Sequence, residues 1–402
     1  MQTEARDTPI YAVIAAVQLP NVPDFEFDAS LTELRELAKT LGLQVVHSFV
    51  QKRTTFDTAA YLGAGKRQEV RDYVAGDDGR EIEFVLVDHE LSPSQARNLE
   101  VEVGCEVMDR TMVILEIFHR NARSRAAKAQ VEIARLGYMA PRLRELAKLA
   151  GSQGRQRGGG GGRGSGESLT ELDRRKIRDR IAELQQEIIA MDAERKTQRA
   201  RRQGSRGLAS VALVGYTNAG KSTLMRALTG SEVLVANKLF ATLDTTVRVL
   251  YPESVPRVLV SDTVGFIKNL PHGLVASFKS TLDEALEAEL LLHVIDASDP
   301  GFERQLEVTD SVLAEIGADA VPRLRVFNKI DHVGDAAAQA DYTAALAFAQ
   351  KRARSMTGLT PEVRYRRLAG ALARRGFAPG LCHRVVHEVT AEGEEFYDPD
   401  RG

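Results

Sequence analysis

The segment GYTNAGKS, which begins at Gly215, has the spacing of a phosphate-binding loop. Gly215 and Gly220 lack the Cβ atom that would hold the backbone away from a phosphate, so successive N–H groups can surround an anion at the positive end of a helix. Lys221 could then reach the terminal phosphates, and the hydroxyl of Ser222 could bind magnesium. Chance glycines in a strand-to-helix turn would also give this pattern. The apolar strand predicted at 211–214 and the helix predicted after the loop favour nucleotide binding.

Two later motifs identify the nucleotide. Asp262 follows an apolar strand at 258–260 and starts the sequence DTVG, in which the carboxylate could hold the magnesium shell through water and the Gly265 N–H could contact a γ-phosphate. The sequence NKID follows another apolar strand, and its Asp331 carboxylate could accept two hydrogen bonds from guanine that adenine cannot supply. Three motifs in this order predict GTP. The residues that they predict to bind it are Gly215, Tyr216, Thr217, Asn218, Ala219, Gly220, Lys221, Ser222, Asp262, Thr263, Val264, Gly265, Asn328, Lys329, Ile330 and Asp331.

The composition indicates an ordinary globular protein. A length of 402 residues corresponds to about two to three domains, and 43% hydrophobic residues are enough to build their cores. No apolar run reaches membrane length, and the first ten residues carry no signal-peptide pattern. The two cysteines, Cys105 and Cys382, lie far apart and lack metal-ligand spacing. We therefore expect a cytoplasmic protein.

Residues from about 10 to 115 alternate between strand-like and helix-like runs, which is typical of a small α/β domain. Within this stretch, the sequence YLGAGK resembles a phosphate loop because Lys66 follows two glycines. However, the second glycine comes too soon, and neither Ser nor Thr follows the lysine. We therefore expect a turn that opens a helix at 67–74, with a second nucleotide site as the alternative.

A basic segment follows this domain. Between Arg120 and Gly207 there are 22 Lys and Arg residues against 10 Asp and Glu, a net charge of +12 in a chain whose net charge is −2. Two long helical patterns, at about 122–149 and 169–202, flank a glycine-rich loop, and the first pattern is expected to break near Pro141. The second pattern has apolar residues at helical spacing, namely Leu172, Ile177, Ile181, Leu184 and Ile188. We expect a helical hairpin.

The glycine-rich loop at 151–167 contains the arginines Arg155, Arg157 and Arg163 among nine glycines. The alternative is that the loop is a flexible linker and the two helices a solvated coiled coil. A linker of that kind, however, would need no arginines. Glycines let a backbone enter a crowded nucleic-acid cleft, while arginines contact phosphates or stack on bases. Concentrated positive charge also binds polyanions by releasing their counterions. We therefore predict that these three arginines contact RNA.

Residues from about 10 to 333 resemble the HflX family of ribosome-associated GTPases. The resemblance rests on YLGAGKRQEV, VDHELSPSQARNLE, GYTNAGKSTL, LFATLD, DTVGFIKNLPHGLVASFKSTL, LLHVIDASDP and NKID, together with the glycine-rich loop. It implies a cytoplasmic bacterial GTPase whose N-terminal and helical parts dock on the large ribosomal subunit. It also implies that the hairpin reaches toward the peptidyl-transferase centre and that the GTP-bound protein dissociates stalled or idle ribosomes.

The same resemblance implies a first switch loop that binds GTP through Phe240, Ala241, Thr242, Leu243 and Asp244. Thr242 would be the hydroxyl that senses magnesium, because a loop threonine reaches the metal only while the γ-phosphate is present. Thr246 is a second candidate. The expected Mg²⁺ ligands are Ser222 and Thr242, with Asp262 acting through water. The expected catalytic residues are Lys221, Thr242 and Gly265.

Phe266 stands where many GTPases place a glutamine that orients the attacking water. An aromatic ring cannot do this, so we expect slow intrinsic hydrolysis that the ribosome accelerates. The chain also departs from the family pattern at Ser165, where proline is usual, at Ser168, where threonine is usual, and at Thr245, where proline is usual. None of these changes removes a charged or metal-binding group.

The chain departs from a complete G domain after Asp331. A further strand, a guanine-contacting loop and a closing helix are expected there, but the sequence instead predicts three short helices at about 336–354, 361–375 and 379–389. Thr360 is the expected N-cap of the middle helix, because a proline follows it. The missing strand would leave an unpaired sheet edge and an incomplete guanine pocket, which would weaken stability and nucleotide affinity.

The tail, at about 340–392, resembles the C-terminal three-helix repeat of RecX, the modulator of the RecA recombinase, most clearly in ALARRGFAPGLCHRVV. The resemblance implies RecA as a second partner. An unrelated basic helical tail that closes the G domain in another way is the alternative.

Four domains are therefore expected in a monomer. They are an N-terminal α/β domain at 1–119, a basic helical hairpin at 120–206, an incomplete P-loop GTPase domain at 207–334 and an all-α tail at 335–402. Two other functions fit the sequence. One is a weakly catalytic or non-catalytic protein that binds ribosomes, RNA or RecA. The other is an ATP-driven RNA-remodelling protein with an N-terminal nucleotide site, against which Asp331 argues at the main site.

Overall fold

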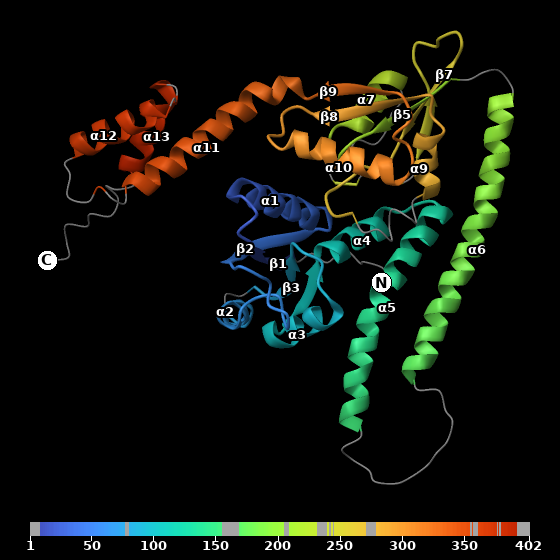
Figure 1. Ribbon diagram of the computed structural model, residues 1–402, viewed down its shortest axis with the longest axis horizontal. Coiled ribbons are helices and arrows are strands. Elements are labelled where there is room, and N and C mark those ends of the chain that lie inside the picture. Colours follow the sequence, from blue (N-terminus) through green and yellow to red (C-terminus); the bar gives the residue numbers. More distant parts are fainter. Residues whose placement is uncertain are drawn as a thin grey trace. The chain divides into compact units, whose positions relative to one another are not determined.

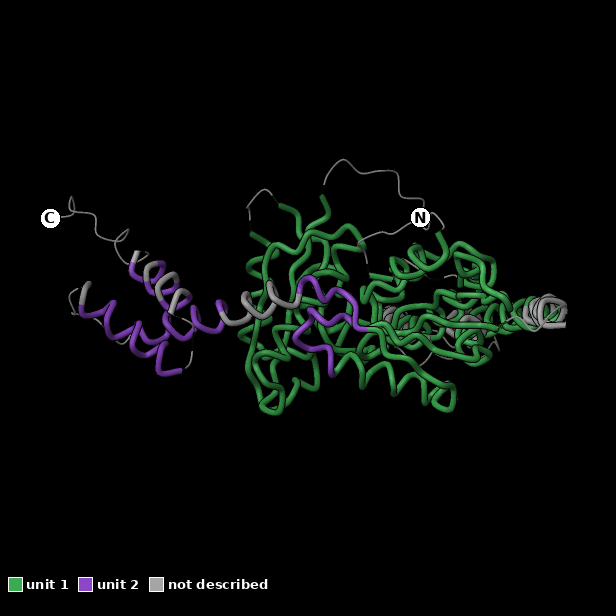
Figure 2. The backbone as a smooth tube through the Cα atoms, turned by 90° about the horizontal axis from the view of Figure 1, so that it is seen from above, with its two compact units in different colours: residues 1–295, 304–326 green, residues 296–303, 327–402 purple. Residues whose placement is uncertain are grey.

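The structure is a computed structural model, shown as a ribbon in Figure 1. It describes residues 9–76, 80–154, 169–204, 209–230, 239–240, 243, 245–270, 279–353, 356, 361–375, 377 and 379–391. The chain forms two compact units, which Figure 2 distinguishes by colour. Unit 1 comprises residues 1–295 and 304–326, and unit 2 comprises residues 296–303 and 327–402.

The first sheet is parallel and four-stranded, with the strand order β2-β1-β3-β4. Its strands are β1 (Ile10–Gln18), β2 (Leu43–Lys52), β3 (Ile82–Val87) and β4 (Glu106–Asp109). Strand β1 is central and has apolar residues on both faces, because helices cover the two faces of a parallel sheet. This explains why its sequence is a continuous apolar run rather than an alternating one.

Two pairs of helices cover the two faces of this sheet. The helices are α1 (Asp24–Thr40), α2 (Ala64–Val74), α3 (Pro93–Val103) and α4 (Arg110–Asn121). Ile14 of β1 belongs to the core that contains α1 and α4, whereas the next residue, Ala15, belongs to the core that contains α2 and α3. The side chains of β1 therefore alternate between two cores, and the predicted N-terminal α/β fold is confirmed.

The basic segment forms two long helices, α5 (Arg125–Gly154) and α6 (Leu169–Gly204), which pack against each other. Leu184 is buried on α6, and Ile177, Ile181 and Ile188 are partly buried, as the helical spacing predicted. Although both helices are long, no helix in the described ranges combines the length and apolar character that a membrane crossing requires.

The predicted break near Pro141 is wrong, because α5 continues through this residue. A proline inside a helix removes the hydrogen bond to the carbonyl of the residue four positions earlier, which here is Gly137. Gly137 and Pro141 are both exposed, so the freed carbonyl can bond to water. The helix therefore loses one hydrogen bond without burying an unpaired polar group.

The second sheet is five-stranded, with the order β6-β7-β5-β8-β9. The strands are β5 (Ala209–Val214), β6 (Thr246–Val249), β7 (Val258–Asp262), β8 (Leu290–Asp296) and β9 (Arg323–Asn328). Strand β6 is antiparallel to β7, and β5 is parallel to both β7 and β8. Its helices are α7 (Lys221–Thr229), α9 (Lys279–Leu286) and α10 (Phe302–Glu315). The strands predicted before the three nucleotide motifs are β5, β7 and β9.

The tail forms three helices, α11 (Val333–Ala353), α12 (Pro361–Arg374) and α13 (Pro379–Ala391). Each lies within three residues of the predicted range. They bury a core of their own, in which Leu368, Leu372 and Val385 are inaccessible to solvent. The tail therefore contains an apolar core of its own, around which its three helices can fold.

Leu372→Ala tests this tail core. The substitution leaves a cavity, so it is expected to lower the free energy of unfolding of the three helices by about 2–5 kcal/mol. Hydrogen exchange at 361–391 measures the effect, and Val363→Ala on the exposed side of α12 is the control. Equal protection in the two variants would contradict a separate tail core.

Candidate nucleotide-binding site

The phosphate-binding loop joins the central strand β5 to the first turn of α7. Gly215 has a φ of +143°, and a Cβ added there would lie 2.3 Å from the carbonyl oxygen of Val294 in β8. Gly220 has a φ of +96° and caps α7. Asn218 also has a positive φ, which asparagine tolerates better than most residues. The local backbone therefore requires the glycines that define the motif.

Lys221 places its ammonium group inside the loop. Its Nζ donates to the carbonyl oxygens of Gly215 at 3.0 Å and Tyr216 at 2.8 Å. Burial lowers the pKa of Lys221 to about 8, and the nearby charge of Asp262 opposes this shift. The loop thus holds a buried cation at the positive end of a helix, which is an environment for phosphate.

Ser222 and Asp262 come together beside this cation. The Ser222 hydroxyl donates to Oδ2 of Asp262 at 2.7 Å, although the two residues are 40 positions apart. Hydroxyl and carboxylate oxygens are the ligands that Mg²⁺ prefers, and a magnesium ion on nucleotide phosphates needs few protein ligands. This pair therefore fits a magnesium ion bound jointly by the protein and a nucleotide.

The segment after Asp262 lies against the phosphate loop. A Cβ added to Gly265 would lie 2.8 Å from Cα of Thr217 and 3.0 Å from Nζ of Lys221. Phe266 is buried and donates from its N–H to the carbonyl of Gly215 at 3.1 Å, while its own carbonyl accepts from the N–H of Thr217 at 2.7 Å. Thr263, also buried, donates to the Leu213 carbonyl at 2.7 Å. The sequence DTVG is thus brought to the phosphate loop.

The loop predicted to be the first switch is described only in part. Phe240 is buried and donates from its N–H to Oγ1 of Thr217 at 3.2 Å, and Leu243 is also buried. Ala241, Thr242 and Asp244 lie outside the described residues. Thr246, the second candidate for the magnesium-sensing hydroxyl, is the first residue of β6 and pairs with Asp262 of β7.

The guanine motif belongs to unit 2. Asn328 ends β9, and its carbonyl accepts from the N–H of Ala297 at 2.9 Å. Lys329 has a positive φ of 57° and forms an ion pair of 2.7 Å with Asp296. Ile330 and Asp331 are both exposed. Sequence reasoning missed Asp296, although its place at the end of an apolar strand, before two further polar residues, was a usable signal.

Two other predictions concern regions away from this site. The sequence YLGAGK forms the expected turn, with Gly63 capping α2, but the helix starts earlier than predicted, at Ala64. Lys66 lies in its first turn and forms an ion pair of 2.6 Å with Glu69. The RNA-binding residues predicted in the glycine-rich loop lie outside the described residues, namely Arg155, Arg157 and Arg163.

Contacts to the N-terminal domain were also missed. Asn121 of α4 donates to the carbonyl of Phe240 at 2.9 Å. Glu33 of α1 accepts from the Tyr216 hydroxyl at 2.7 Å, and Glu26 of the same helix pairs with Lys268 at 3.1 Å. In the sequence, these acidic residues of α1 look like ordinary solvent-facing positions of an amphipathic helix, so the pattern gave no signal.

Four sequence models of protein families match the chain. Their descriptions are GTP-binding GTPase N-terminal at residues 28–119, GTP-binding GTPase Middle Region at 121–202, 50S ribosome-binding GTPase at 210–329, and RecX, third three-helix domain, at 339–386.

Relatives named GTPase HflX also match most of the chain. The relative from Gluconacetobacter diazotrophicus is 55% identical, over 81% of this chain and 78% of its own. The relative from Caldanaerobacter subterraneus subsp. tengcongensis is 44% identical, over 82% and 74%. The relative from Escherichia coli K12 is 42% identical, over 81% and 74%.

The second sheet and the phosphate loop define a P-loop GTPase, which binds GTP and hydrolyses it. The identity with these relatives, over about four fifths of this chain and three quarters of theirs, makes the assignment more specific. The chain belongs to the HflX family of GTPases.

Gly215→Ala tests the close packing of the phosphate loop. The new Cβ would meet the Val294 carbonyl at 2.3 Å and occupy a left-handed backbone position, so we expect a loss of stability of about 1–3 kcal/mol and at least tenfold weaker GDP binding. Thermal unfolding and fluorescence titration measure these effects.

Gly137→Ala is the matched control, because a Cβ at this position of α5 meets nothing within 4 Å. It is expected to stabilise the helix by about 0.5–1 kcal/mol and to leave GDP binding unchanged. Similar GDP affinities in the two variants would contradict the steric role of Gly215.

Proposed function

We propose that this GTPase binds the large ribosomal subunit in its GTP-bound form and promotes the dissociation or rescue of ribosomes. The observation that carries the proposal is the match of residues 210–329 to a model described as a 50S ribosome-binding GTPase, in a chain of the HflX family. The net charge of +12 between Arg120 and Gly207 supports it, because such a charge favours a partner rich in RNA.

In the proposed reaction, water attacks the γ-phosphorus of GTP and GDP leaves. Lys221 binds the terminal phosphate oxygens, and the N–H of Gly265 contacts the γ-phosphate. Ser222 and Thr242 would hold Mg²⁺, with Asp262 acting through water, and the metal would neutralise charge on the β- and γ-oxygens.

Guanine recognition is proposed for the NKID motif. Asp331 would accept from the ring N–H and the amine of guanine, while Asn328 and Lys329 would support the base. The Asp331 side chain is exposed, so its carboxylate is accessible to the guanine of a bound nucleotide. The ion pair between Lys329 and Asp296 supports the loop conformation.

The helical hairpin is proposed as the RNA-contacting element. Helices of 30 and 36 residues correspond to lengths of about 45 and 54 Å, which is enough to carry a loop deep into a ribosomal subunit. Arg155, Arg157 and Arg163 would contact phosphates or bases at the tip.

The GTPase domain is proposed to lack its last strand, guanine-contacting loop and closing helix, within the boundaries 207–334. Two observations support this. The match to the GTPase family model ends at residue 329, and β9 exposes Leu324 by 55% and Phe327 by 52%. Large apolar side chains exposed on an edge strand are expected where the strand or helix that would cover them is missing. Lower stability and weaker nucleotide binding than in a complete domain would follow.

The tail at 335–402 is proposed to contact RecA. The match of residues 339–386 to the RecX model supports this second role. We further propose a monomer that acts in the cytoplasm. A weakly catalytic binding protein is the alternative, and it predicts ribosome association that does not depend on the nucleotide. An ATP-driven RNA-remodelling protein is the other alternative, and competition of labelled GTP by ATP would reveal it.

Co-sedimentation with large ribosomal subunits tests the proposed partner. The protein is expected to be retained mainly with a non-hydrolysable GTP analogue, and much less with GDP or without nucleotide. Equal retention in all three states would instead favour nucleotide-independent RNA binding.

A triple substitution of Arg155, Arg157 and Arg163 by Gln is expected to reduce this retention at least tenfold, because three phosphate contacts are lost. A triple substitution of Arg366, Arg367 and Arg374 by Gln removes the same charge from exposed positions of α12 and serves as the control. Equal losses in the two variants would contradict a specific role of the loop.

We also expect slow intrinsic hydrolysis of GTP, because Phe266 is buried and cannot orient water. Phosphate release is expected to accelerate at least tenfold when large subunits are added. Equal turnover with and without ribosomal particles would be incompatible with the proposed activation.

A further inference from the structure

We propose that Tyr216 and Glu33 determine the preference of this GTPase between GDP and GTP. They hold the segment Gly265–Lys268, which we term the γ-sensing segment, against the phosphate loop. This proposal rests on GTP binding and not on the proposed ribosomal role.

Three hydrogen bonds join the γ-sensing segment to the phosphate loop. Two involve Phe266, as described above, and form a parallel bridge between Tyr216 and Phe266. The third runs from the N–H of Lys268 to the hydroxyl of Tyr216 at 2.9 Å. A side chain of the phosphate loop thus fixes the end of the γ-sensing segment.

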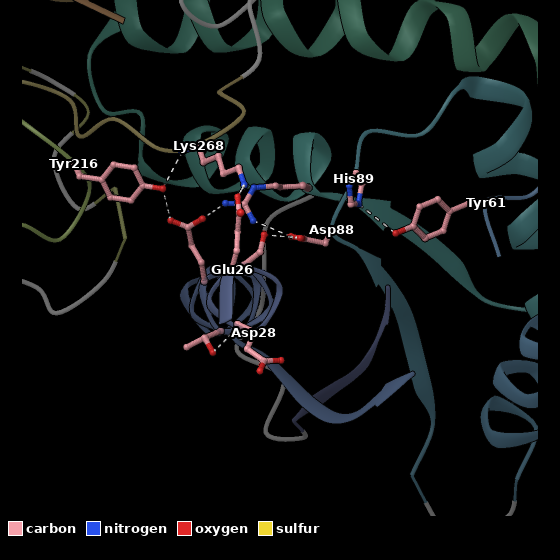
Figure 3. A network of polar contacts seen from close by, with 11 residues as sticks. Glu26, Asp28, Tyr61, Asp88, His89, Tyr216 and Lys268 are labelled. Carbon is pink, nitrogen blue, oxygen red and sulfur yellow. Dashed lines mark hydrogen bonds and ion pairs between the residues drawn. The ribbon is translucent and has the colours of Figure 1, made fainter. Parts of the chain in front are cut away.

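The Tyr216 hydroxyl is itself held by the N-terminal domain. It donates to Oε1 of Glu33 at 2.7 Å, and Tyr216 is only 8% exposed. Burial, reinforced by the charge of Glu33, raises the pKa of Tyr216. The hydroxyl therefore stays protonated and can donate to Glu33 while it accepts from Lys268. Figure 3 shows Tyr216 and Lys268 near α1.

Glu33 is a fixed acceptor because its second oxygen is also bound. Oε2 accepts from the guanidinium of Arg110, which is 2% exposed. Arg110 also donates to Oδ1 of Asp88 at 2.9 Å, and the other oxygen of Asp88 accepts from Ser30 at 2.5 Å. A carboxylate bound in this way moves little, so the position of Tyr216 is set by α1, α4 and the residue that follows β3 rather than by the phosphate loop alone.

A second contact joins the γ-sensing segment to α1. Nζ of Lys268 lies 3.1 Å from Oε1 of Glu26, whose other oxygen lies 2.9 Å from Arg304 of α10. The Lys268 side chain is 43% exposed, so this ion pair is screened by water and contributes less than the buried hydroxyl.

The position of Gly265 connects these contacts to the nucleotide. The glycine packs on Thr217 and Lys221, closer than a Cβ would allow. A γ-phosphate bound to the Lys221 ammonium needs space on this side of the loop, so the γ-sensing segment has to shift from its present position until the Gly265 N–H faces the phosphate. That movement breaks the bond between Lys268 and Tyr216. GDP lacks the γ-phosphate. The hydrogen bond between Lys268 and Tyr216, which we term the latch, therefore opposes GTP binding and leaves GDP binding unaffected.

Titration of the full-length chain with fluorescent GDP and with a fluorescent non-hydrolysable GTP analogue tests the latch. Tyr216→Phe keeps the ring but removes the hydroxyl. We expect the affinity for the analogue to rise about three- to tenfold relative to that for GDP, the size of one lost hydrogen bond. Glu26→Gln is expected to shift the same ratio in the same direction by less than threefold.

Glu36→Gln is the matched control, because Glu36 lies on the same helix and pairs only with the exposed Lys39 in the described residues. It is expected to leave both affinities unchanged. An unchanged ratio in Tyr216→Phe would overturn the proposal. So would an equal loss of affinity for both nucleotides, since this indicates a role in packing alone. Glu26→Gln leaves the buried hydroxyl in place, so its ratio provides an independent test if Tyr216→Phe folds poorly.

Discussion

The nucleotide site depends on two places where the backbone approaches too closely for any side chain. At Gly215, a Cβ would lie 2.3 Å from a carbonyl of β8, and at Gly265 it would lie 2.8 Å from the backbone of Thr217. These approaches bring β8 and the segment that follows β7 against the phosphate loop. Within this loop, the buried ammonium of Lys221 donates to the carbonyls of Gly215 and Tyr216. The chemistry of the site therefore follows from packing density as much as from the identity of its charged groups.

The N-terminal sheet supports this arrangement from outside the GTPase domain. In open parallel sheets, ligands often bind at the carboxyl ends of the strands where the strand order reverses. Here Asp88 and Arg110 directly follow β3 and β4, and Arg110 binds Glu33, the partner of Tyr216. The carboxyl end of this sheet is thus connected to the phosphate loop through Glu33 of α1.

Much of this structure was predictable because local rules dominate it. Motif spacing located the phosphate loop, and helical periodicity with a first-turn proline located α12 at Pro361. The break at Pro141 was predicted wrongly, since a local rule cannot show that the freed carbonyl of Gly137 faces solvent. Glu33 and Glu26 were missed for a similar reason. Their partners lie more than 180 residues away in the sequence, and no pattern in the residues of α1 indicates these contacts.

The separate core of the tail has a consequence for how this protein denatures. Leu368, Leu372 and Val385 are packed in a core formed by α11, α12, α13 and residues between these helices, in a unit distinct from the one that holds the N-terminal sheet. Two cores of different size and composition are expected to unfold at different temperatures, and a chain that contains both is then not expected to obey a two-state scheme. A calorimetric trace of this protein is therefore expected to be a sum of overlapping transitions that one melting temperature does not describe.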